Sequence, residues 1–203
     1  MASPIFTIGH SSHPIADFIR LLKKHSIEVL CDVRTTPLSK FAPQFNRESL
    51  SGALYRNRIR YVFLGGVLGG RPADPTHIID GRASYSRMAN SEEFRNGLFT
   101  VRSLAQSRRV ALMCAEKDPA DCHRGILVAR ELATAGNDVR HILADGSLET
   151  QSDVVDRIIT RLGLHDDLFR SRKDVVFSAY EEQESRIAWR PKPTTSNLAS
   201  VSN

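Results

Sequence analysis

The sequence predicts an α/β protein, with a mainly parallel sheet of about five strands covered by helices on both faces in a strand order left open. Two observations predict this class. Short apolar runs alternate along the 203 residues with segments whose apolar side chains recur at helical spacing. In addition, 41% hydrophobic and 25% charged residues are typical of a soluble globular protein, and no apolar run is long enough to span a membrane.

The apolar runs predict the strands, and helical periodicity predicts the segments between them. The strand candidates are, in chain order, Pro4–Gly9, Glu28–Val33, Arg60–Leu64, Arg109–Ala115 and Asp138–Leu143. After the first strand we expect a helix capped by Ser12, with Pro14 in its first turn. The further helices are expected at Arg47–Asn57, Glu92–Gln106, Pro119–Ala135 and Val154–Leu162.

The composition changes along the chain and divides it into three parts. Residues 1–148 form the expected α/β domain, which would carry the functional site. Residues 149–189 are expected to add a helical extension. Residues 190–203 are rich in Pro, Ser, Thr and Asn, and we expect this tail to be disordered.

The positive charge is concentrated in the middle of the chain. Between Arg34 and Arg108, 12 Lys and Arg residues stand against 5 Asp and Glu residues, a local net charge of +7 within a total of +5. This favours an anionic partner, either a small molecule or a nucleic acid, although a solvated basic surface has the same composition. Three cysteines and an N-terminus without the features of a secretory signal indicate a cytoplasmic protein without a disulfide framework. The sequence predicts no particular cofactor and no oligomeric state.

Residues with catalytic potential follow the predicted strands. Because the carboxyl ends of parallel strands meet at one edge of the sheet, ligands bind there. These residues are His10 and Ser11 after the first strand, Asp32 and Arg34 at the second, Gly65–Arg71 after the third, Cys114 and Glu116 at the fourth, and 144–146 after the fifth. The planar fork of Arg34 suits a phosphate. Asp32 could orient a substrate, act as a base or pair with an arginine, and His10 could move protons or simply pack.

The connection from Gly65 to Asn90 has little periodicity and is long for a compact domain. Loops of this length are often functional. It begins at the same edge of the sheet, so we expect it to cover the substrate. Its candidate contacts are Arg71, His77, Arg82, Tyr85 and Arg87.

The stretch LMCAEKDPADCHRGILVAREL joins the fourth strand to a helix. Asp118 is the expected N-cap of that helix, which would place Cys122 on its buried apolar stripe. Cys31 is expected to be buried in the same way. Cys114 ends the strand and would face the helix N-terminus near Arg124, which predicts a lowered thiol pKa, although a merely buried thiol remains the alternative.

A metal site in this stretch is not favoured by the sequence. Cys114, Cys122 and His123 could supply three ligands, with His10 or Asp32 as a fourth. However, the seven residues between the cysteines fit no common zinc spacing. Neighbouring side chains of a helix also point about 100° apart, so Cys122 and His123 would not converge on one ion. We therefore expect no resident metal.

The segments TIGHSS, CDVRTTP, FAPQFNRESL, YVFLGGVLGGRP and LMCAEKDPADCHR occur in this order. Together they resemble the bacterial and archaeal family catalogued as domain of unknown function 488, over roughly residues 5–148. The resemblance implies a shared site but no established reaction. It would be formed by His10, Ser11, Asp32, Arg34, Phe45, Asn46, Gly69, Gly70, Arg71, Tyr85, Cys114, Glu116, Cys122, His123 and Arg124. The resemblance thus implies a functional role for Cys122, whereas its helical spacing predicts a buried core residue. Both can hold if Cys122 and Cys114 form a buried pair just below the edge of the sheet.

Three functions follow from these observations. The first is an enzyme that binds a phosphorylated or nucleotide-like anion through Arg34, Arg71 and Arg124. His10, Asp32, Cys114, Glu116 and His123 are the catalytic candidates. Hydrolysis or group transfer is expected rather than hydride transfer, because no dinucleotide-binding glycine motif follows the first strand. The second is a protein that binds or processes nucleic acid through its basic segment and nearby aromatic residues. The third is a thiol redox or metal-sensing module.

Overall fold

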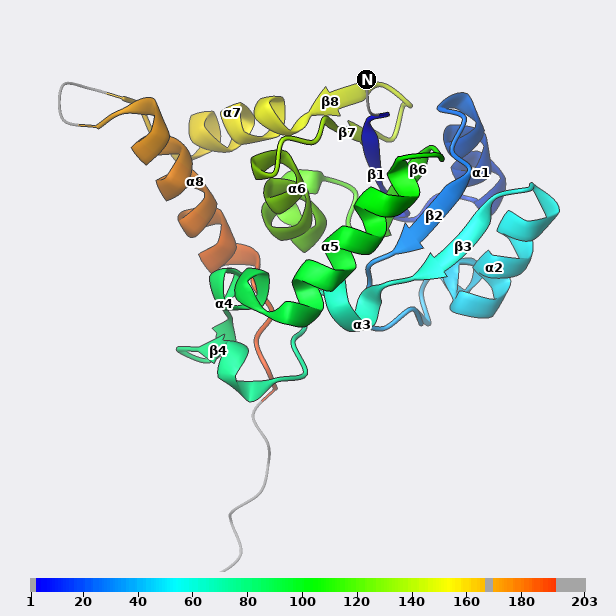
Figure 1. Ribbon diagram of the computed structural model, residues 1–203, viewed down its shortest axis with the longest axis horizontal. Coiled ribbons are helices and arrows are strands. Elements are labelled where there is room, and N and C mark those ends of the chain that lie inside the picture. The colour runs from blue at the N-terminus through cyan, green and yellow to red at the C-terminus, as the bar shows by residue number, and fades with distance from the viewer. Residues whose placement is uncertain (1–2, 167–169, 193–203) are drawn as a thin grey trace, which may run out of the picture.

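A six-stranded sheet forms the centre of the protein, as seen in a computed structural model that describes residues 3–166 and 170–192 (Figure 1). The strand order is β3-β2-β6-β1-β7-β8. The first five strands pair in parallel, and β8 pairs antiparallel to β7 at the edge. The strands are β1 (Ile5–Gly9), β2 (Val29–Asp32), β3 (Arg60–Phe63), β6 (Val110–Cys114), β7 (Val139–Ile142) and β8 (Leu148–Thr150).

The predicted class and its five strands are confirmed, each to within two residues at its ends. The strand β8 was missed. It is three residues long and has no buried residue, so it lacks the apolar run by which the others were found.

Helices cover both faces of the sheet, as expected. On one face α1 (Ile15–Lys24) and α2 (Arg47–Arg56) pack on side chains of β1, β2, β6 and β7. The other face is covered by α5 (Glu92–Ala105), α6 (Arg130–Thr134) and α7 (Gln151–Leu162). The expected cap of the first helix is wrong: Pro14 precedes α1, and no side chain caps it.

The predicted helix at Pro119–Ala135 is broken near its start. Pro119–Asp121 forms one turn of 3-10 helix, capped by Asp118 as expected. Cys122 is then extended (φ −140°, ψ 140°), and a π-helical segment at Arg124–Ala129 leads into α6. At Gly125 a Cβ atom would lie 2.1 Å from the Pro119 carbonyl oxygen, so glycine lets the second segment pack against the first turn.

The segment between β3 and α5 has more structure than its sequence predicts. It contains α3 (Gly65–Leu68), a 3-10 turn at Pro75–His77, a hairpin of β4 (Ile78–Ile79) and β5 (Arg82–Ala83), and α4 (Tyr85–Asn90). Each element is too short to show a period in the sequence.

The C-terminal extension shares the core of the α/β domain. Side chains of α7 and of α8 (Arg172–Ile187) belong to the same buried cluster as those of β2 and β6. Of the expected disordered tail, residues 193–203 lie outside the described residues. None of the helices in the described part of the chain has the length and apolar character needed to cross a membrane.

Candidate functional site

The strand order opens a crevice at the carboxyl ends of β1 and β6. These strands are neighbours, but the chain leaves β1 for α1 on one face and leaves β6 for α6 on the other. Such a reversal is where ligands bind in open α/β sheets. A cavity of about 390 Å³, here called the site pocket, lies at this point. This volume is within the roughly 300–1,000 Å³ typical of small-molecule sites.

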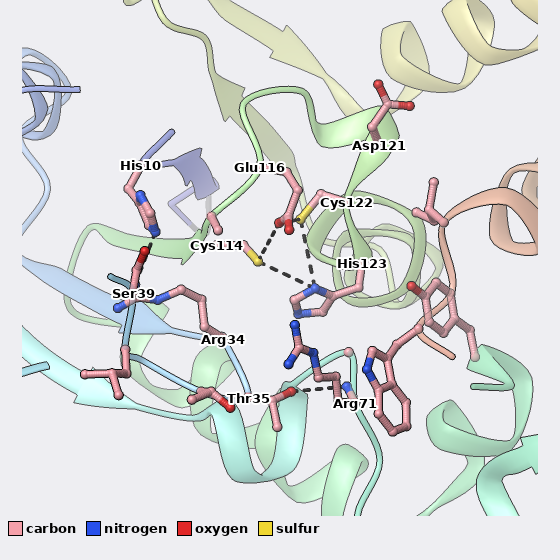
Figure 2. A pocket seen from close by; sticks show the side chains of 17 residues that line it. His10, Arg34, Thr35, Ser39, Arg71, Cys114, Glu116, Asp121, Cys122 and His123 are labelled. Carbon is pink, nitrogen blue, oxygen red and sulfur yellow. Dashed lines mark hydrogen bonds between the residues drawn. The ribbon is translucent and has the colours of Figure 1, made fainter. Parts of the chain in front are cut away.

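The structure brings most of the predicted site residues to the site pocket. Those that line it are His10, Arg34, Gly70, Arg71, Tyr85, Cys114, Glu116, Cys122 and His123 (Figure 2). Six others do not line it, namely Ser11, Asp32, Phe45, Asn46, Gly69 and Arg124. The connection from Gly65 to Asn90, here called the covering segment, therefore contributes Gly70, Arg71 and Tyr85, whereas His77, Arg82 and Arg87 lie elsewhere.

Asp32 pairs with Arg34, which is the third of the roles left open for it. The Asp32 carboxylate is completely buried and accepts bonds from Arg34 Nε (2.9 Å) and Nη2 (2.6 Å), from the Arg34 backbone (3.1 Å) and from the Tyr61 hydroxyl (2.9 Å). Arg34 Nη2 also donates to the Phe45 carbonyl at 2.8 Å. These contacts fix the guanidinium, and its remaining nitrogen, Nη1, bonds to His10 Nε2 at 3.2 Å. Asp32 thus positions Arg34 and is enclosed away from any ligand.

His10 is held as a neutral imidazole. Its ring stacks on Phe45, with the ring centroids 4.3 Å apart. Nδ1 donates to the Ser11 carbonyl (2.8 Å), and Nε2 accepts from Arg34 Nη1 (3.2 Å). Burial, with the charge of Arg34, lowers the pKa of His10 to about 4. At pH 7 the neutral ring carries a single proton, on Nδ1, which is bonded to the Ser11 carbonyl, so the geometry favours a role for His10 in orienting Arg34.

Four side chains converge in the wall of the site pocket (Figure 2). They are Cys114, Glu116, Cys122 and His123, here called the Cys/Glu/His cluster. Glu116 Oε2 lies 3.0 Å from each sulfur, and His123 Nδ1 lies 3.6 Å from Cys114 Sγ and 4.0 Å from Cys122 Sγ. The expectation that Cys122 and His123 diverge is wrong, because the extended Cys122 does not belong to a helix.

The environment of the cluster separates the two thiols. Burial and the adjacent Cys122 and Glu116 raise the pKa of Cys114, so the predicted activation of this thiol is wrong. Burial opposes a charge on Cys122 as well. Nevertheless, its hydrogen bond with Cys114 and the positive charges of Arg124 and His123 hold its pKa well below the usual range. Cys122 is therefore the more acidic thiol.

The other two members of the cluster have raised pKa values. Burial and the charge of Cys122 raise the pKa of the Glu116 carboxyl. For His123, burial acts against protonation, but the hydrogen bond with Cys122 and its charge raise the pKa. Two titratable groups with perturbed pKa values in one wall of a cavity are candidates for proton transfer.

The orientation of His123 is fixed from two sides. His123 Nε2 lies 3.1 Å from the Val33 carbonyl, which can only accept, so Nε2 carries a proton. Gly70 packs against the ring, where a Cβ atom would lie 2.8 Å from His123 Cγ. Nδ1 therefore faces the two sulfurs.

Arg124 is completely buried and does not reach the site pocket. Its Nη1 and Nη2 donate to the Glu116 and Lys117 carbonyls at 2.6 Å and 3.0 Å, and its Nε donates to Thr7 Oγ1 at 3.4 Å. All three donor groups thus have partners within the protein. The prediction that Arg124 grips an anion therefore has no support in its placement.

Three further predicted residues shape the loops around the site pocket. Asn46 Oδ1 accepts from the Ser39 backbone at 2.7 Å. Gly69 lies so close to Thr35 that a Cβ atom would be 2.3 Å from its hydroxyl. Ser11 has a φ of 46°, and its backbone N–H donates to the Ala115 carbonyl at 2.8 Å.

Several residues that line the site pocket were missed. They are Thr35, Thr36, Leu38, Ser39, Ala115, Asp121, Ile187 and Trp189. The first four continue the loop after β2, so the strand-end argument could have been extended to them. The sequence around Trp189 does not indicate that this residue lines the site pocket. Its position depends on the packing of α8 and on the hydrogen bond that the Ala83 backbone N–H donates to the Trp189 carbonyl at 2.8 Å.

Comparison with known proteins adds one match. The model of a family described as domain of unknown function DUF488 matches residues 14–130, which is more than half of the chain. No curated protein and no solved structure matches the chain. The matched range contains the loop after β2, the covering segment and the whole Cys/Glu/His cluster.

Proposed function

The chain belongs to the family described as domain of unknown function DUF488, and we propose that it is an enzyme for a small phosphorylated or nucleotide-like anion. The anion binds in the site pocket and is hydrolysed or has a group transferred. One observation carries this proposal. Two guanidinium groups, of Arg34 and Arg71, border the same cavity as the Cys/Glu/His cluster.

The two arginines play different parts. Arg34 is 6% exposed and rigidly held by Asp32, so it offers a fixed donor at Nη1 without further loss of side-chain freedom. Arg71 is exposed, and among the described residues its guanidinium has no hydrogen-bond or ion-pair partner. It can therefore close on a ligand as a bidentate clamp.

The chemistry requires groups that move protons or attack the substrate. Glu116 and His123 have raised pKa values, and Cys122 is the more acidic thiol. They lie within one wall of the site pocket. The hydroxyls of Thr35 and Ser39 line another part and provide uncharged donors for an anion. This combination suits hydrolysis or group transfer.

A nucleic-acid-binding or nucleic-acid-processing protein is the second candidate. Phe41 is fully exposed next to Lys40, a pairing that suits base stacking beside a phosphate. Two other aromatic residues of the basic segment, Tyr61 and Tyr85, are not free to stack on bases, because Tyr61 bonds to Asp32 and Tyr85 is buried.

Both candidates are consistent with the cytoplasm, where the three free cysteines would stay reduced.

Calorimetric titration with inorganic phosphate and nucleoside monophosphates tests the first candidate. Arg71→Ala should weaken binding roughly 10- to 100-fold, the equivalent of one lost charge-assisted bond. Arg102→Ala is the matched control, because it removes the same charge from the exposed face of α5. Phosphate release from a panel of phosphomonoesters and phosphodiesters then tests turnover. Equal binding by wild type and Arg71→Ala would refute the assignment of the clamp.

Binding of random oligonucleotides at several salt concentrations tests the second candidate. A nucleic-acid protein loses affinity steeply as salt rises. Absent or salt-independent binding removes this candidate.

A further inference from the structure

We propose that Cys114, Glu116, Cys122 and His123 bind one zinc ion in the wall of the site pocket. The proposal goes beyond the proposed function, because it does not depend on which anion, if any, the pocket receives. With the ion bound, Glu116, Cys122 and His123 would be its ligands, and the proton-transfer roles given to them above apply to the metal-free protein.

The geometry of the donor atoms is the first argument. The two sulfurs, the carboxylate oxygen and His123 Nδ1 all lie within 4.8 Å of one another. Around tetrahedral zinc, with bonds of about 2.3 Å to sulfur and about 2.0–2.1 Å to nitrogen or oxygen, donor atoms lie roughly 3.3–3.8 Å apart. The four separations between sulfur and oxygen or nitrogen, 3.0, 3.0, 3.6 and 4.0 Å, bracket that range. Shifts of about half an ångström would complete the polyhedron.

The contacts behind the donors are those of a metal site. His123 donates from Nε2 to the Val33 carbonyl, so the lone pair of Nδ1 points at the sulfurs. A ligating histidine is commonly oriented by such a bond from its other ring nitrogen. The Arg124 backbone N–H points at Cys122 Sγ from 3.4 Å, and the Arg124 side chain holds the Glu116 carbonyl. Two ligands are thereby braced by one buried residue.

The donor set and its charge select the ion. Two sulfurs with one imidazole and one carboxylate suit zinc, whereas magnesium and calcium prefer oxygen donors alone. Two thiolates and a carboxylate carry three negative charges, of which zinc neutralises two. The buried cation of Arg124 lies close enough to offset the third.

The position of Glu116 connects the proposed ion to the site pocket. All four residues line the pocket, but Cys114 and Cys122 are buried and His123 is half-buried, whereas Glu116 is exposed. Glu116 is therefore the zinc-coordinating side chain on the accessible side. A small molecule that enters the pocket would reach the ion from that side.

Metal analysis of the untagged, reduced protein tests the proposal. We expect one zinc per chain after dialysis, and uptake of one equivalent by metal-stripped protein in competition with a chromophoric chelator. Cys114→Ser, Cys122→Ser and His123→Ala should each weaken zinc binding by at least about 100-fold, beyond the effect usual for an outer-shell contact. Cys31→Ala is the matched control, because Cys31 is an equally buried thiol outside the cluster.

Two further measurements keep the test independent of folding and of anion binding. Glu116→Gln changes the most accessible ligand. This variant should bind zinc more weakly than wild type even though its circular dichroism spectrum shows that it is folded. Cobalt added to the metal-stripped wild type should give sulfur-to-metal charge-transfer absorption, which Cys114→Ser and Cys122→Ser lose. Arg71→Ala should keep its zinc even where it loses phosphate binding, which separates this proposal from the proposed function.

The proposal is overturned if reduced wild-type protein takes up no zinc. It is equally overturned if Cys31→Ala loses as much zinc as Cys122→Ser, or if folded Cys114→Ser and Cys122→Ser bind zinc as tightly as wild type.

Discussion

Replacing Asp32 by asparagine should damage both the stability of the protein and its affinity for an anion. Asp32 accepts four hydrogen bonds, three of them from Arg34. An asparagine keeps one oxygen but places an NH₂ group against Arg34 Nη2, where the present bond is 2.6 Å long. The buried guanidinium then loses its counter-charge. Breaking a buried ion pair from one side costs about 3–5 kcal/mol, and one bond to a charged group about 1.5–3 kcal/mol.

Urea unfolding followed by circular dichroism measures this cost, and it corresponds to a fall in melting temperature of roughly 6–20 °C for a domain of this size. Tyr61→Phe is the control within the same network, because it removes a single bond to Asp32 and leaves Arg34 paired. It should cost at most about 3 kcal/mol and leave phosphate affinity unchanged. The reasoning is refuted if Asp32→Asn is as stable as Tyr61→Phe or more stable. It is also refuted if Asp32→Asn binds phosphate as tightly as wild type.

Acid should destabilise the protein through its two buried neutral histidines. Burial lowers the pKa of both His10 and His141 to about 4, so the unfolded chain binds more protons between about pH 6.5 and pH 4. The free energy of unfolding should fall as pH is lowered through that window, by up to roughly 3 kcal/mol for the enclosed His141, and His141→Gln should flatten the slope in urea titrations. A slope unchanged in His141→Gln would contradict this. Gly70→Ala should cost about 1–3 kcal/mol in the same assay, because its Cβ would press on His123 at 2.8 Å. Gly66→Ala has open space and should be neutral or stabilising, so an equal loss in the two variants would argue against the packing explanation.

The strands and the location of the site were predictable because their signals are local. A buried parallel strand such as β6 is a continuous apolar run, and the end of that run fixes where Cys114 and Glu116 emerge. The common edge then follows from parallel pairing without knowledge of the strand order. This is why nine of the predicted residues line one cavity.

The conformation of Cys122 was not predictable from its neighbours. Its spacing from Ile126 and Ala129 fits a helical stripe, and the residue is indeed buried. The break depends instead on the close approach of Gly125 to the Pro119 carbonyl, a tertiary contact that no period in the sequence reports. The same break brings the side chains of Cys122 and His123 together, and so the sequence argument against a metal site failed at its premise that these two side chains diverge.

Arg34 and Arg124 show why a residue type alone does not assign a role. Both were expected to hold an anion, and both are buried cations whose donors bond within the protein. Arg34 is paired with a carboxylate and keeps Nη1 at the cavity, so its charge is balanced before any ligand arrives. Arg124 donates to two carbonyls and a hydroxyl, none of which is charged. A buried cation without a carboxylate partner requires negative charge nearby, and the nearest supply is the Cys/Glu/His cluster. Arg124 therefore favours anionic sulfur at Cys122 from inside the protein, whereas Arg34 and Arg71 remain the groups that an entering anion would meet.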